Sequence, residues 1–93
     1  METVADFKTL ASGQVMEIRP PSTEEWIIHN ILVSNKAGLE RSNGSVDFEF
    51  DEVTEAGGWN VQFFHVTSAQ FLKVRNKLGS SIHAAYDGVK TKR

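Results

Sequence analysis

The chain has 93 residues, of which 40% are hydrophobic, and this supports one small hydrophobic core but not two. It contains no cysteine, which excludes disulfide bonds and thiolate metal sites. The net charge of −2 at pH 7 is not that of a nucleic-acid-binding surface, and no apolar run reaches the roughly 20 residues that span a bilayer. We therefore expect a single domain with no membrane span, no export signal and no nucleic-acid partner.

The first strand pattern begins only after a segment that we expect to be an N-terminal arm, residues 1–13. Residues 14–93 are then expected to form the folded domain. Within it, residues 14–19 are typical of a short strand, which ends at Pro20 and Pro21 because proline cannot donate a ladder hydrogen bond.

Residues 25–34 form the longest apolar run and are predicted to be the central strand. With a two-residue period, apolar side chains fall on both of its faces. The two sets are Trp26, Ile28 and Leu32 on one face and Ile27, Ile31 and Val33 on the other. We therefore expect both faces to be covered, one of them by another subunit.

Residues 35–45 are rich in Asn, Gly and Ser and are predicted to be a loop. Residues 46–51 then alternate strictly between apolar and acidic side chains, which predicts a half-buried strand. We expect the apolar set in the core and the acidic set in solvent: Val46, Phe48 and Phe50 inside, and Asp47, Glu49 and Asp51 outside.

After a break at Gly57 and Gly58, residues 59–66 alternate again and predict another strand. Residues 71–78 fit two structures. A capping box at Thr67 favours a helix, whereas alternation of apolar residues with Lys73, Arg75 and Lys77 favours a strand. The pattern alone leaves this open.

The chain closes with two expected short strands, residues 82–86 and 89–93, separated by a turn at Asp87 and Gly88. Short strands separated by turns predict an all-β fold, a single-domain β-sandwich or jelly roll with the N-terminal arm.

No residue pattern indicates catalysis or a cofactor. The serines lie in turn-rich stretches without a nucleophile elbow, and the acidic residues form a row on one strand instead of facing each other across a cleft. His29, His65 and His83 lack the close spacing of metal ligands, and a calcium site would need the further ligand of an EF-hand loop. We therefore expect a non-enzymatic protein with no metal or cofactor, whose histidines are structural.

Charge is unevenly distributed, because residues 1–69 carry a net −7 and residues 70–93 a net +5. Either the basic residues pair across strands with the acidic row of the same chain, or opposite patches of neighbouring copies meet. The N-terminal apolar residues are likewise either part of a frayed end or a docking device that orders on a partner. The candidate partner-binding residues are Val4, Phe7, Leu10, Asp47, Glu49, Asp51, Lys73, Arg75 and Lys77.

Three stretches that span most of the chain, residues 10–31, 68–81 and 85–92, resemble small β-sandwich structural proteins of tailed bacteriophages. The later two are similar to a strand, a Gly-Ser turn and a closing Tyr-x-Gly-Val strand of those proteins. The resemblance favours a strand at residues 71–78. It implies a virion protein, foremost a capsid decoration (cement) protein that binds the assembled head in many copies, with tail or fibre attachment as an alternative.

The resemblance also implies the partners and the location. These are the phage major capsid protein or another virion protein, in a virion assembled in the host cytoplasm. Further copies of this chain, in a dimer or trimer, are expected because residues 26–33 are apolar on both faces. The competing interpretation is a carbohydrate-binding β-sandwich module, because Trp59 and Tyr86 adjoin predicted turns where aromatic rings can face a sugar.

Overall fold

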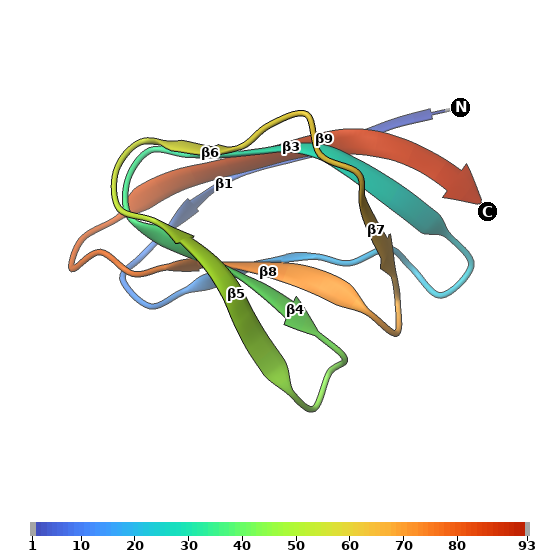
Figure 1. The fold of residues 1–93 in the computed structure, drawn as a ribbon, viewed down its shortest axis with the longest axis horizontal. Helices are drawn as coiled ribbons and strands as arrows, with labels where there is room; N and C mark the ends of the chain where they lie inside the picture. The colour runs from blue at the N-terminus through green and yellow to red at the C-terminus, as the bar shows by residue number, and fades with distance from the viewer. Residues whose placement is uncertain (1, 93) are drawn as a thin grey trace.

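A computed structural model describes residues 2–92, which form two antiparallel sheets stacked on each other (Figure 1). Sheet I has the order β1-β9-β3-β6, and β7 also pairs with β3. Its strands are β1 (Glu2–Leu10), β3 (Glu25–Val33), β6 (Gly57–Trp59), β7 (Phe64–Thr67) and β9 (Ile82–Lys92). Sheet II has the order β2-β8-β4-β5, with β2 (Val15–Ile18), β4 (Ala37–Ser42), β5 (Asp47–Val53) and β8 (Phe71–Asn76). The prediction of an all-β sandwich is confirmed.

The core lies between the inner faces of the two sheets. Its side chains are almost inaccessible to solvent, and burying each large one stabilises the fold by about 1.5–3 kcal/mol. They include Ile28, Ile31, Ile82 and Ala84 from sheet I and Met16, Ile18, Leu39, Leu72 and Val74 from sheet II. None of the described residues form a helix that is able to cross a membrane.

Three of the predicted strands are present at the expected positions. Residues 14–19 contain β2, residues 25–34 contain β3, and the ambiguous residues 71–78 contain the strand β8 and no helix. In β8, Leu72 and Val74 point into the core while Lys73 and Arg75 are only partly buried, as the strand alternative requires. Pairing with both β2 and β4 fixes this segment as a strand.

The expected loop at residues 35–45 is wrong, because residues 37–42 form β4 in the interior of sheet II. Ala37 and Leu39 are fully buried, and the strand pairs with β5 on one side and β8 on the other. Gly38, which suggested a turn, has a packing role instead. The side chains of Glu49 and Lys77 lie where its Cβ would be.

The N-terminal segment is not an arm outside the sandwich, because Glu2–Leu10 form β1, paired with β9 along the whole strand. Leu10 is buried in the core. The buried Asn76 side chain holds the end of β1 by donating hydrogen bonds from Nδ2 to the carbonyl oxygens of Leu10 and Ser80, at 3.0 and 2.8 Å.

The expected turn at Asp87 and Gly88 is also wrong, because both residues lie inside the continuous strand β9. Gly88 sits opposite Ile28, next to a bulge in β3, and a Cβ at this glycine would overlap the backbone of Ile27 and Ile28. The glycine therefore permits close approach of two strands.

The predicted faces of β3 are wrong, because the same bulge lies at His29. It shifts the alternation by one residue, so that Ile28, Ile31 and Val33 all point into the core. Leu32 instead faces outward with 47% of its surface exposed.

Residues 59–66 are not one strand either, since β6 ends at Trp59 and β7 begins at Phe64. Between them Val61 has a φ of 56°, a left-handed conformation that interrupts an extended chain and that β-branched residues rarely adopt.

Candidate functional site

The outer face of sheet II carries an array of charges that are paired within the chain. Glu40 is only 5% exposed, and its carboxylate accepts a hydrogen bond from Arg75 Nε at 2.7 Å. Lys73 lies 3.1 Å from Asp47, and Lys77 lies 2.9 Å from Glu49 and 2.6 Å from Glu52. We call this set the charged face: Glu40, Asp47, Glu49, Glu52, Lys73, Arg75 and Lys77.

The pKa shifts on the charged face agree with this pairing. Hydrogen bonds from Ser42 and then Lys73 lower the pKa of Asp47, and a hydrogen bond from Lys77 lowers that of Glu52. The Glu40 carboxylate raises the pKa of Arg75. Each of the three candidate bases thus forms an ion pair within its own chain: Lys73, Arg75 and Lys77.

Asp51 does not lie in the outward-facing acidic row that was predicted for residues 47–51. A bulge at Phe50 shifts the alternation, so Asp51 lies opposite the buried Leu39 while Glu52 takes its place on the charged face. The Asp51 carboxylate accepts a hydrogen bond from Trp59 Nε1 at 2.9 Å, and this bond lowers its pKa. Its role is to tie β5 to β6.

The N-terminal candidates fall into three different environments. Leu10 is 3% exposed and therefore cannot dock on a partner. Val4 is partly buried against the core. Phe7 is 67% exposed on the outer face of sheet I, where its ring lies tilted against the His83 ring, with centroids 5.8 Å apart.

The prediction that Val46, Phe48 and Phe50 are core residues is wrong. They are 63%, 64% and 41% exposed. Phe48 lies opposite Arg41 and so belongs to the inward side of sheet II, but β5 is the edge strand, and sheet I does not extend far enough to cover it. In Figure 1 the β4–β5 hairpin points away from the sheet that holds β3 and β9.

These side chains form a continuous aromatic surface at the open edge of the sandwich. The ring centroids of Phe48 and Phe50 are 6.4 Å apart, and those of Phe50 and Phe64 are 6.3 Å apart. Only Phe64 is packed against the core. We call Val46, Phe48, Phe50 and Phe64 the aromatic edge.

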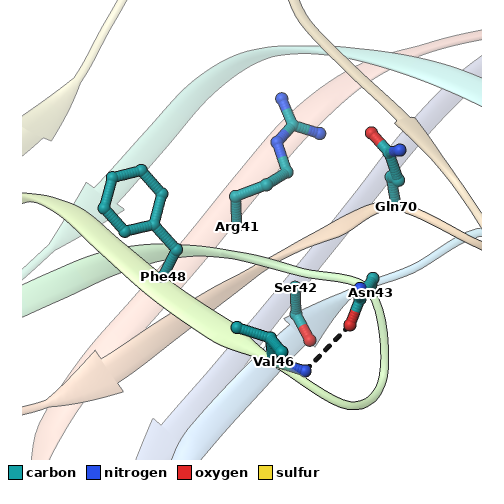
Figure 2. A pocket seen from close by; sticks show the side chains of 6 residues that line it. All are labelled: Arg41, Ser42, Asn43, Val46, Phe48 and Gln70. Carbon is teal, nitrogen blue, oxygen red and sulfur yellow. Dashed lines mark hydrogen bonds between the residues drawn. The ribbon is translucent and has the colours of Figure 1, made fainter.

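A hollow of about 220 Å³ opens beside the aromatic edge (Figure 2). It is lined by Arg41, Ser42, Asn43, Val46, Phe48 and Gln70. The turn beneath it is fixed by the Asn43 side chain, whose Oδ1 accepts a hydrogen bond from the Val46 amide at 2.8 Å. Apolar and polar groups therefore meet in one concave surface.

Arg41 is the charged group of this hollow. Its Nη1 donates a hydrogen bond to the His65 carbonyl oxygen at 2.8 Å, and among residues 2–92 it forms no ion pair within 4.0 Å. Desolvation lowers its pKa from the ordinary arginine value. A partly buried guanidinium without a counter-ion is a binding position for an anionic group.

The three histidines lie apart and have separate partners: Gln62 for His29, Glu25 for His65 and Thr9 for His83. Within the described part of the chain, no group of three or more His, Cys, Asp and Glu residues is placed to hold a metal ion. The proposed sugar-facing aromatics are buried, with Trp59 7% and Tyr86 9% exposed.

Sequence reasoning misses Arg41, Ser42 and Asn43, because the composition of residues 35–45 predicts a loop, and it misses Gln70, which lies in the turn before β8. The available signal was the alternation of Ala37, Leu39 and Arg41, which places all three on one face of a strand. A comparison with protein-family models found no match to this chain, and a search of curated proteins found none either.

Proposed function

We propose that the protein is a non-enzymatic attachment protein of a tailed-phage virion, a decoration protein that binds the assembled head through its aromatic edge. The sequence resemblance supports the class of assembly, and the exposed aromatic surface supports attachment as the activity. The major capsid protein is the proposed partner, and the virion the proposed location.

The observation that carries the proposal is the contrast between charged and apolar surfaces. The bases of the charged face are paired within the chain, whereas four of the six phenylalanines are more than 40% exposed. Leaving large apolar side chains in water forgoes the stabilisation that burial provides, and contiguous exposed groups of this kind mark binding surfaces. Phe48 and Phe50 are adjacent members of such a group.

The lining of the hollow supports a partner that combines apolar and anionic groups. Val46 and Phe48 offer apolar contact, and Arg41 offers a charge-assisted bidentate hydrogen bond within the same concave surface. The complementary surface is therefore an apolar segment that carries a carboxylate. Burying Phe48 in such a contact would contribute about 1.5–3 kcal/mol per copy before ordering costs.

Co-sedimentation with empty heads of the phage whose genome encodes the chain tests the proposal. The wild-type protein is expected to sediment with heads in a saturable manner. Phe48→Ser and Arg41→Gln are expected to weaken this binding while the free proteins remain folded by circular dichroism. Phe63→Ser is the matched control, because Phe63 is 75% exposed but contacts His29, outside the aromatic edge.

Absence of saturable binding to heads would overturn the head-decoration proposal. Binding to purified tails or fibres in the same assay would assign the protein to those structures instead. Binding to an immobilised glycan array with no affinity for any virion part would favour the carbohydrate-binding alternative. Equal loss in Phe48→Ser and Phe63→Ser would contradict the aromatic edge as the attachment surface.

A further inference from the structure

The open side of β1 is a long unpaired strand edge. Within residues 2–92, β1 pairs only with β9, so one side of a nine-residue strand has no neighbouring strand. Such edges are templates for pairing with another chain unless they are guarded. Beside this edge, Phe7 lies opposite Ala85, and Ala85 lies opposite Leu32, which forms an outward apolar row across β1, β9 and β3.

Hydrogen bonds show which backbone amide and carbonyl groups of β1 face its open side. The Phe7 amide donates to the side chain of its neighbour Asp6, at 2.8 Å. The backbone amide and carbonyl of His83, opposite Thr9, bond to Ser34 on the side of β9 away from β1. Because backbone groups alternate along an antiparallel strand, the amides and carbonyls of Thr3, Ala5, Phe7 and Thr9 face the open side. These groups are positioned to hydrogen-bond with an added strand.

The side chains of β1 favour one register for pairing with a second copy. A two-fold axis at Asp6 would place two carboxylates opposite each other, which is destabilising. An axis at Ala5 would place Asp6 opposite the apolar Val4, and Lys8 opposite Glu2, which already lies 3.7 Å from Lys90.

An axis at Phe7 avoids both conflicts. Asp6 of each copy then lies opposite Lys8 of the other, giving two symmetric opposite-charge pairs. The two Phe7 rings meet on the axis. The apolar row then runs unbroken from Leu32 of one copy, through both Phe7 rings, to Leu32 of the other.

The remaining strand edges are poorly suited to self-pairing. The far edge of sheet I is divided between β6, with three residues, and β7, with four. The edge strand β5 carries Asp47, Glu49, Asp51 and Glu52 and no base, so antiparallel pairing with itself would bring acidic strands together. The edge strand β2 has only four residues. The long, charge-complementary edge is therefore β1.

We infer that two copies of the chain associate through antiparallel β1–β1 pairing centred on Phe7, joining their two copies of sheet I into one continuous sheet. In the dimer the Phe7 amide donates a hydrogen bond to the Phe7 carbonyl of the second copy. The Asp6 carboxylate, which accepts from this amide in the single chain, then pairs with Lys8 of the second copy. The inference is independent of the proposed attachment, because it is tested on free protein without phage heads.

Sedimentation equilibrium of charge-reversal variants tests both the association and its register. The wild type is expected to be a dimer, and Lys8→Glu or Asp6→Lys each to raise the dimer dissociation constant at least about tenfold, because two attractive pairs become repulsive. An equimolar mixture of the two variants is expected to form a heterodimer. Circular dichroism of each variant checks that the monomer remains folded.

Cross-linking provides a second readout that does not depend on charge. The chain has no cysteine, so Phe7→Cys introduces a single thiol, which a short bifunctional thiol reagent should link to its symmetry mate at a Cα separation of about 5.5 Å. Ala5→Cys on the same face is the control and is expected to remain unlinked. A monomeric wild type at high micromolar concentration, a failure of the variant mixture to dimerise, or linking at position 5 instead of 7 would each overturn the inference.

Discussion

Replacing Arg75 by alanine is expected to destabilise the protein by about 3 kcal/mol, because it leaves the Glu40 carboxylate without its cation. Glu40 is 5% exposed, and Arg75 Nε is 2.7 Å from its Oε2, so the charge is paired in a largely desolvated position. Removing one partner of a buried pair costs about 3–5 kcal/mol, and the lower end applies here because the Arg75 side chain is 37% exposed and water can enter the vacated space.

Urea denaturation followed by tryptophan fluorescence measures this loss, with Lys73→Ala as the matched control. Lys73 pairs with Asp47, whose side chain is 38% exposed, and the loss there is expected to be no more than about 1 kcal/mol. The double variant Glu40→Gln/Arg75→Ala should recover part of the stability, because the uncompensated charge is removed. A cost for Arg75→Ala as small as that for Lys73→Ala would refute the interpretation of Glu40 as a buried charge held by Arg75.

The remaining predictions concern packing and pH. Phe71→Ala is expected to cost about 3–5 kcal/mol and Phe48→Ala less than about 1 kcal/mol, since Phe71 is 1% and Phe48 64% exposed; equal losses in urea denaturation would contradict this difference in burial. Gly88→Ala is expected to cost about 2 kcal/mol or more because its Cβ would overlap the β3 backbone, whereas Gly79→Ala, with nothing within 4 Å, should be nearly neutral in the same assay. The pKa values of Asp47, Asp51 and Glu52 are lowered in the folded state, so the stability they contribute is present above about pH 4 and is lost as the pH falls further; a thermal midpoint that stays constant from pH 5 to pH 2 would disprove this linkage.

The fold class and several strands were predictable because they depend on local alternation. β8 shows this, since Lys73 and Arg75 alternate with the buried Leu72 and Val74. β4 was not predictable by composition, because Gly38 and Ser42 resemble turn residues until the side chains packed around them are known. Gly88 led to the wrong prediction of a turn for the same reason, because this glycine allows two strands to approach closely.

The candidate site was less predictable than the fold, because burial depends on position within the sheet. Alternation in β5 correctly separates Phe48 from Asp47 and Glu49, but it contains no information on whether the opposite sheet extends over that strand. The bulge at Phe50 then moved Asp51 to the inward side, which no two-residue period anticipates. Arg41 became a candidate only when β4 placed it beside Phe48.

Hydroxyl-radical footprinting of the protein bound to phage heads tests the central claim most directly, because it reports which side chains the partner covers. The account predicts that Phe48 and Phe50 lose reactivity on binding while Phe63 remains as reactive as in the free protein. Protection confined to the charged face around Lys73 and Lys77, with Phe48 still reactive, would contradict attachment through the aromatic edge.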